Sequence, residues 1–179
     1  MIPVDRALEI VLAHTRPLPA EDVLLEHAVG RVLAEDVASD LDLPPFDRAM
    51  MDGYALRAED VASAPARLAV AGQIRAGQHR DRPLEPGQAV QIMTGAPVPP
   101  GATAVQQVEK TRAADGGRAV EILESVDKGA HIAPAGSEVR AGQVVLRQGV
   151  TLDPAAVARL ASASDTMMPV SWAMRLRNL

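Results

Sequence analysis

Residues 43–55 carry the first side chains that could do chemistry, the carboxylates of Asp47 and Asp52. The segment reads LPPFDRAMMDGYA, and its two prolines exclude a helix because each removes a backbone N–H and restricts its predecessor. Asp52-Gly53 is a turn sequence in which Gly53 tolerates a positive φ, so it can present the Asp52 carboxylate from a stiff support. Asp47 could share the same pocket. The alternative is a structural hairpin in which Asp52 hydrogen-bonds only its own turn.

Residues 91–101 carry the second candidate, a hydroxyl beside a glycine. The segment reads QIMTGAPVPPG, in which a strand is expected to end before Thr94 and prolines stiffen the exit. Thr94 and Gly95 offer a hydroxyl and an unobstructed backbone N–H, which together can hold an oxyanion or a phosphate edge. The alternative is a rigid connection in which Thr94 only caps the end of the strand.

Other kinds of site find little support in the sequence. The four histidines lie far apart and lack the spacing of a zinc motif, and the chain has no cysteine, which excludes disulfides and thiolate chemistry. Motifs typical of P-loop, Rossmann and α/β-hydrolase proteins are absent. A complete small hydrolase is therefore not favoured.

Charge and hydropathy exclude two classes of partner. The net charge is −5, and no basic run exceeds two residues, whereas a nucleic-acid binder needs clustered cations. No stretch reaches the roughly 20 apolar residues that span a bilayer. Asp5 and Glu9 do not fit the start of a signal peptide. We therefore expect a cytoplasmic protein with no nucleic-acid or membrane partner.

Apolar periodicity predicts helices near both ends and strands between them. Helices are expected over 4–13, 28–34 and 153–163, the last with Asp153 as its N-cap. Short apolar runs separated by Gly and Pro predict strands over 67–70, 89–93, 104–108 and 118–122. Gly116-Gly117 is the expected turn between the last two of these.

These patterns predict an α+β fold in which a mixed α/β outer domain, formed by both chain ends, receives an inserted small β-rich domain. The outer domain is expected over 1–45 and 140–166, the inserted domain over 46–139, and a loosely ordered tail over 167–179. Aromatic residues make up only 2% of the chain, so core residues contribute little contact area each. Part of the apolar surface is therefore expected to be buried against a partner.

The two candidate segments resemble the signatures of one family, the molybdopterin molybdenumtransferases of the MoeA and gephyrin E-domain type. Residues 43–55 resemble its L-P-x-F-D-N-S-A-M-D-G-Y-A signature, and residues 91–101 resemble its I-M-T-G-A-P-V-P-x-G signature. A third match is Gly136-Ser137-Glu138, where the family carries G-x-D before a similar strand. Order and spacing agree from about Asp5 to Ala163.

The resemblance implies an enzyme that inserts molybdenum from molybdate into adenylylated molybdopterin and releases AMP. Asp52 and Thr94 would then be catalytic. Asp52 would polarise water or hold Mg²⁺, a cation that prefers carboxylate oxygen, and Thr94 would donate to a phosphate or molybdate oxygen. Asp47, Gly95 and Glu138 would contact the cofactor. The resemblance also implies a homodimer whose cofactor pocket lies chiefly in a third domain.

The sequence departs from the family pattern in three respects. Arg48-Ala49-Met50 replaces Asn-Ser-Ala, and the new cation could neutralise a carboxylate or attract an oxyanion. Glu138 stands where the family has Asp. The third domain has no counterpart after Ala163, so the chain is expected to be an N-terminal two-domain region. It would be inactive alone and need a separate chain with the cofactor-binding domain. The alternative is a non-enzymatic dimerisation or scaffold module in the same pathway.

Overall fold

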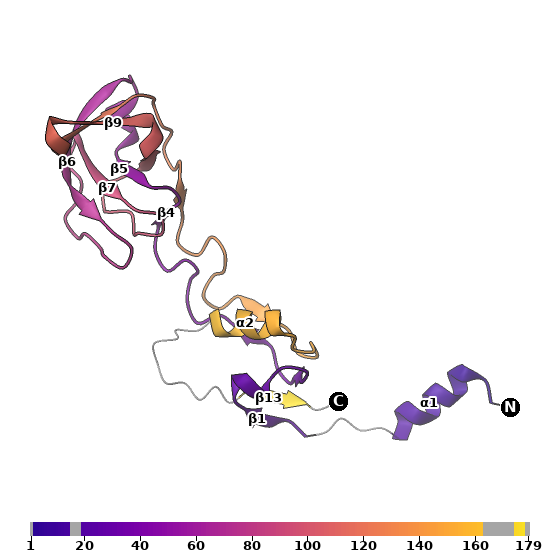
Figure 1. The fold of residues 1–179 in the computed structure, drawn as a ribbon. Coiled ribbons are helices and arrows are strands. Elements are labelled where there is room, and N and C mark those ends of the chain that lie inside the picture. Colours follow the sequence, from indigo (N-terminus) through magenta and orange to yellow (C-terminus); the bar gives the residue numbers. More distant parts are fainter. Residues whose placement is uncertain (1, 15–18, 163–173, 178–179) are drawn as a thin grey trace. The chain divides into compact units, whose positions relative to one another are not determined.

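The chain forms two units, which are described separately. The computed structural model describes residues 2–14, 19–162 and 174–177. One unit comprises Met1–Leu41 and Val139–Leu179, and the other comprises Asp42–Glu138. The central unit is therefore inserted in sequence between the two parts of the first, and Figure 1 shows most of the β-strands gathered in it.

A six-stranded mixed sheet forms the centre of the Asp42–Glu138 unit. Its strands lie in the order β8-β5-β7-β6-β10-β9, with β6 parallel to β7 and every other neighbouring pair antiparallel. The strands are β5 (Gly53–Leu56), β6 (Ala66–Ile74), β7 (Gln88–Ile92), β8 (Ala104–Gln107), β9 (Thr111–Ala114) and β10 (Ala119–Ile122). The four predicted strands are confirmed. Strand β9 was not predicted, because it is an edge strand with no buried residue and hence no apolar pattern.

Each face of this sheet has its own core, because successive side chains of a strand point to opposite faces. Ala55, Val90 and Val105 belong to one buried cluster. Their neighbours Leu56 and Ala89 belong to the other. All four residues of β5 are buried, so β5 is sandwiched between the two clusters.

Smaller elements complete the central unit. The two-residue strands β4 (Arg48–Ala49) and β11 (Ile132–Ala133) pair with each other. Single turns of 3-10 helix are η2 (Ala58–Val61), η3 (Val108–Lys110) and η4 (Asp115–Gly117). The predicted turn at Gly116-Gly117 lies in η4, between β9 and β10, where both glycines have positive φ.

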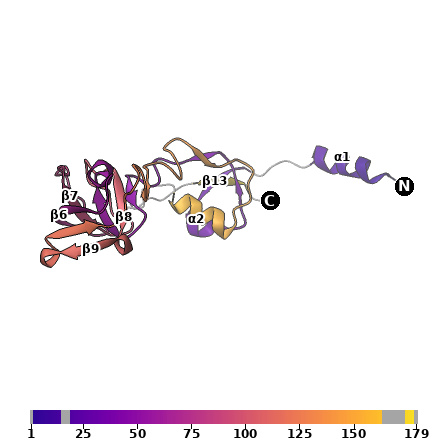
Figure 2. The same cartoon turned by 90° about the horizontal axis from the view of Figure 1, so that it is seen from above.

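The outer unit packs a helix against short strands. Helix α2 (Pro154–Ser162) begins after Asp153, whose Oδ1 accepts the Ala156 N–H at 2.7 Å, which confirms the predicted N-cap. Ala156 and Leu160 of α2, the helix labelled in Figure 2, pack with Leu33 and Leu146. The short strands are β1 (Glu21–Val23), β2 (Val32–Leu33), β3 (Val37–Ala38) and β12 (Val144–Leu146).

Two expectations for the outer unit need correction. Residues 28–34 do not form the predicted helix. A 3-10 turn, η1 (Leu25–His27), precedes these residues, and Val32–Leu33 forms β2. The reason is Gly30, whose φ of 82° interrupts any helix. Within the expected tail, β13 (Met174–Arg177) pairs with β1 and β2. Its alternation of apolar residues with arginines has the period of a strand. Residues 167–173 and 178–179 lie outside the described residues.

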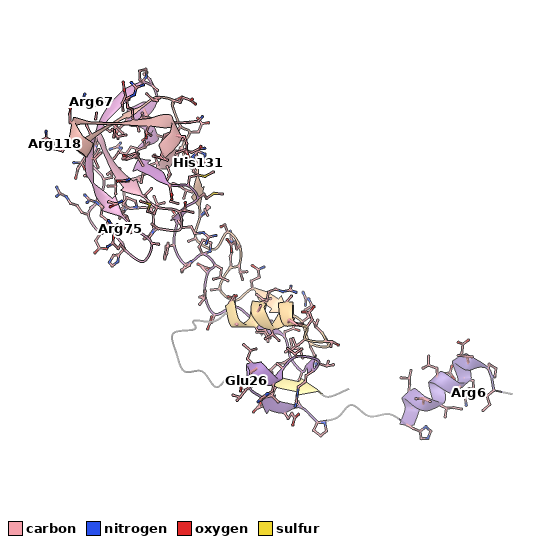
Figure 3. All side chains as sticks on the ribbon, viewed as in Figure 1. Arg6, Glu26, Arg67, Arg75, Arg118 and His131 are labelled. Carbon is pink, nitrogen blue, oxygen red and sulfur yellow. The ribbon has the colours of Figure 1, made fainter. Side chains whose placement is uncertain are left out.

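Helix α1 (Val4–His14) has no buried residue. Its apolar residues Val4, Leu8, Val11 and Leu12 are all more than half exposed, and Figure 3 shows side chains projecting from it on all sides, Arg6 among them. In the part of the chain that the structure describes, no helix has the length and apolar character needed to cross a membrane.

Gly53 permits the close approach of β5 and β8. A Cβ on Gly53 would lie 1.9 Å from the backbone oxygen of Gln106, far inside any allowed contact. Gly53 is not among the residues with positive φ, so the predicted reason for a glycine here is wrong. It is needed because a side chain would separate two paired strands.

Gly53→Ala is expected to lower the free energy of unfolding by about 1–3 kcal/mol or more, as overpacking does in a rigid interior. Chemical denaturation of the chain measures the loss. Gly77→Ala is the control, because its Cβ meets nothing within 4 Å and only the left-handed backbone at φ 77° opposes it. A loss no larger at Gly53 than at Gly77 would contradict the steric explanation.

Candidate functional site

The register of β5 and β7 brings Asp52 to Thr94. Gly53, the first residue of β5, pairs with Ile92, the last residue of β7. Because the two strands are antiparallel, the residue before Gly53 and the residues after Ile92 emerge at the same end of the sheet. Asp52 and Thr94 therefore meet although 42 residues separate them.

Both hydrogen-bond donors of Thr94 hold the Asp52 carboxylate. Oδ1 of Asp52 accepts the backbone N–H of Thr94 at 2.7 Å and the Thr94 hydroxyl at 2.7 Å. The backbone bond first, and then the hydroxyl bond, lower the pKa of Asp52, because they stabilise the charged form. The side chain of Asp52 thus bonds a distant corner of the chain, and it presents an exposed negative charge at neutral pH.

The Thr94 corner does not offer the free N–H groups predicted from its sequence. The N–H of Thr94 donates to Asp52, that of Gly95 to the Ala49 oxygen at 2.9 Å, and that of Ala96 to the Met93 oxygen at 3.0 Å. The prediction of an unobstructed N–H is therefore wrong, because β4 lies against the corner and accepts the Gly95 hydrogen.

Asp47 makes a different contact from Asp52. Its Oδ1 accepts the N–H of Ala135 at 2.8 Å, and its backbone oxygen accepts the N–H of Val98 at 2.8 Å. These bonds tie three chain segments of the central unit together. Asp47 does not border the cavity that lies beside Thr94, and its contact with a cofactor stays a prediction.

A cavity of about 590 Å³ opens within the central unit beside the Asp52–Thr94 contact. Such a volume is typical of small-molecule sites. Three of the predicted site residues line it, namely Thr94, Gly95 and Glu138, and Asp52 adjoins it through its bonds to Thr94. The other lining residues are Arg48, Ala49, Met50, Ile132, Ala133, Pro134 and Ser137.

Arg48 and Glu138 form an ion pair in the wall of this cavity. The Nη2 of Arg48 lies 2.6 Å from the Oε1 of Glu138. Arg48 and Glu138, the two charged side chains among the departures from the family signatures, are thus partners. Of the two roles open to Arg48 in the sequence, pairing with a carboxylate is the one observed. No local pattern could have revealed it, because 90 residues separate the two.

A polar pair, His131 and Gln107, was also not predicted from the sequence. The Nδ1 of His131 lies 2.8 Å from the Val105 oxygen, which can only accept, so Nδ1 carries the proton. The Nε2 then accepts from the Gln107 amide at 3.0 Å. The backbone oxygen of His131 accepts the N–H of Met50, which fixes part of the cavity wall. Figure 3 labels His131 in the central unit.

The donor set suits a Mg²⁺ ion only in a limited way. Among residues 2–14, 19–162 and 174–177, no three His, Asp or Glu side chains are grouped as metal ligands. Asp52 offers one carboxylate, of which Oδ1 is occupied by Thr94. Since Mg²⁺ commonly keeps several waters and binds one or two carboxylates together with substrate phosphates, Asp52 fits an ion that arrives with a phosphate.

The α+β fold and the cavity beside Thr94 are the features by which this chain can be compared with known families of protein domains. The family model described as "MoeA N-terminal region (domain I and II)" matches residues 2–164, and the chain belongs to this family. Its structure is similar to that of the molybdopterin biosynthesis moeA protein from Pyrococcus horikoshii OT3, with a TM-score of 0.87 and 36% identity. The match covers 99% of this chain and 46% of that one, and it confirms the predicted fold class.

Two curated relatives are similar in sequence over almost the whole chain. The molybdopterin molybdenumtransferase of Bacillus subtilis is 38% identical over 175 residues, which cover 94% of this chain. Molybdopterin molybdenumtransferase 2 of Mycobacterium tuberculosis is 44% identical over 171 residues, which cover 93% of it. The chain spans 41% of the length of each relative.

Replacing Thr94 is expected to raise the pKa of Asp52 towards its ordinary value. Thr94→Val removes the hydroxyl bond and keeps the backbone bond, so the rise is partial, and Thr94→Ser restores the low value. Because the folded pKa of Asp52 is below the unfolded one, its bonds stabilise the fold above the unfolded pKa. That contribution is lost as the pH falls through the folded pKa. A carboxyl NMR titration measures each pKa, and an unchanged value in Thr94→Val would contradict the assignment.

Proposed function

We propose that this chain is the N-terminal part of a molybdopterin molybdenumtransferase. The enzyme would take molybdenum from molybdate into adenylylated molybdopterin and release AMP. Its relatives are molybdopterin molybdenumtransferases. The observation that carries the proposal is the Asp52–Thr94 contact, which presents an ionised carboxylate beside a cavity of small-molecule size.

In this proposal Asp52 is the group that acts on the reacting anions. The hydrogen bonds from Thr94 stabilise the negative charge of Asp52 and fix its carboxylate. Asp52 can therefore hold a metal-bound or free water in a fixed direction. Thr94 serves mainly to position Asp52, because both of its donors already point to Oδ1. Mg²⁺, when bound through Asp52 and a substrate phosphate, would offset the charge of two anions brought close together.

Turnover is proposed to need the remainder of the enzyme. This chain corresponds to 41% of the length of its relatives, and its cavity has one arginine and one glutamate as its charged lining residues. A polyanionic cofactor needs more positive partners than one ion-paired arginine supplies. The remaining contacts would come from the cofactor-binding part, in the same or another polypeptide.

A second candidate function, a non-enzymatic dimerisation or scaffold module, is favoured by helix α1. Leu8, Val11 and Leu12 occupy one helical stripe and are 55%, 59% and 63% exposed. An apolar stripe of this kind gains free energy when another surface covers it. We propose that a second copy of the chain covers it, which gives a homodimer in either function.

Asp52→Asn tests the enzymatic proposal. The chain is mixed with a polypeptide that carries the remainder of the enzyme, adenylylated molybdopterin, Mg²⁺ and molybdate, and AMP release is measured. The amide oxygen of the introduced asparagine can still accept from Thr94, so the variant removes the charge and keeps the geometry. A fall in rate of about 100-fold or more is expected for loss of an acid–base or metal-holding group.

The matched control is Asp60→Asn, in which the altered carboxylate accepts the Gly87 N–H at 2.8 Å and lies outside the cavity. This variant is expected to release AMP at the rate of the unaltered chain. Equal rates for Asp52→Asn and Asp60→Asn would contradict the role of Asp52. No AMP release from a folded mixture of unaltered proteins would favour the scaffold function.

The dimer is tested by light scattering at micromolar concentration, where the mass of two chains is expected. Leu8→Glu combined with Leu12→Glu places two charges in the apolar stripe and is expected to give the mass of one chain. Arg6→Gln is the control, because it removes only the exposed Arg6–Glu9 pair of the same helix. A mass of one chain for the unaltered protein would contradict the dimer.

A further inference from the structure

The wall of the cavity beside Thr94 includes the positively charged side chain of Arg48, and its ion pair with Glu138 adds little to the stability of the fold. Of the lining residues, Arg48 and Glu138 are the charged ones, and Asp52 is hydrogen-bonded to a third lining residue, Thr94. Exposed ion pairs contribute little to stability because water screens both charges. The side chains of Arg48 and Glu138 are 41% and 57% exposed, so a purely structural role explains the pair poorly.

Among the residues that the structure describes, the ion pair uses one of the N–H donors of the Arg48 guanidinium. Arg48 has five N–H donors in a planar fork, and its hydrogen bond runs from Nη2 to Glu138 Oε1 at 2.6 Å. The other donors can serve an anion in the cavity while Glu138 holds the group in place. Arginine commonly binds phosphate through two parallel N–H···O bonds, and the remaining donors of Arg48 are enough to form them.

The charge and size of the cavity together indicate the class of ligand. The carboxylates of Asp52 and Glu138 would repel an anion, and Arg48 is the lining residue that offsets them. A volume of about 590 Å³ suits an organic molecule far better than a single inorganic oxyanion. Apolar lining residues, such as Met50 and Ile132, would face the uncharged part of such a molecule.

We propose that Arg48 is a specificity-determining contact for the phosphate group of an organic ligand, and that Glu138 is its positioning residue. The proposal rests on the proposed function, because it concerns the same cavity. It adds a cationic contact made by a side chain that departs from the family signature. Glu138 fixes the direction of the guanidinium, and the free edge of Arg48 receives the phosphate.

The test compares binding of AMP and of adenosine to the 179-residue chain, by titration calorimetry at low ionic strength. The unaltered chain is expected to bind AMP more tightly, because adenosine lacks the phosphate. Arg48→Ala is expected to weaken AMP binding about tenfold, the loss of one charged hydrogen-bonded contact, and to leave adenosine binding unchanged. Arg48→Lys keeps the charge without the fork and is expected to fall between the two.

Glu138→Gln separates positioning from simple charge. If Glu138 orients Arg48, the variant binds AMP more weakly, although the cavity has become less negative. Tighter binding would overturn the positioning role. The double variant Arg48→Glu with Glu138→Arg restores an ion pair in reverse. It is expected to keep the thermal midpoint of the unaltered chain without recovering AMP binding, and recovery would show that only the pair itself matters.

Molybdate and inorganic phosphate serve as competing probes. Both are expected to bind much more weakly than AMP, and molybdate binding as tight as that of AMP would overturn the assignment to an organic phosphate. Equal AMP affinities for the unaltered chain and Arg48→Ala, or no AMP binding at all, would overturn the proposal. Either result leaves the Asp52-dependent release of AMP untouched, so failure of this proposal is distinguishable from failure of the proposed function.

Discussion

The arrangement of the cleft depends on the pairing of β5 with its two neighbours. Gly53 lies so close to the backbone of Gln106 that any side chain would push the strands apart. Its pairing with Ile92 sets the register of β5 and β7. That register puts Asp52 and Thr94 at one end of the sheet, and their mutual hydrogen bonds follow from it. The two-sided burial of β5 opposes slippage of the register, because a shift of one residue would move each of its side chains out of the core that it fits and into the opposite one.

Opposing charges then define what the cleft can accept. The hydrogen bonds from Thr94 stabilise the ionised form of Asp52. Its negative charge repels anions unless a cation accompanies them. Two sources of positive charge are compatible with the geometry. One is Mg²⁺ that arrives with a phosphate, and the other is Arg48, which Glu138 holds at the cavity wall. Both would offset the charge of an anionic ligand, and they differ in whether the protein or the ligand would supply the cation.

Sequence patterns predict the structure correctly where the pattern is local. Helix α2 and the Asp153 cap follow from spacing and one side-chain bond, and the apolar runs between Gly and Pro are strands β6, β7, β8 and β10. Elements with a weak pattern, or with pairing partners far away in the sequence, are not predictable in this way. The edge strand β9 has no apolar signature, and β13 pairs with strands more than 140 residues earlier, too far along the chain for any local window.

Residue types by themselves determined which side chains could do chemistry and to which family the chain belongs, because a long signature fixes identity and order without reference to contacts. Only the tertiary structure decided how those side chains are used. It directed both donors of Thr94 to Asp52, gave the Gly95 hydrogen to Ala49, and joined Arg48 to Glu138. The physical reason is that a donor or a charge takes whichever partner the fold brings within about 3 Å, and strand register sets that distance between residues remote in sequence.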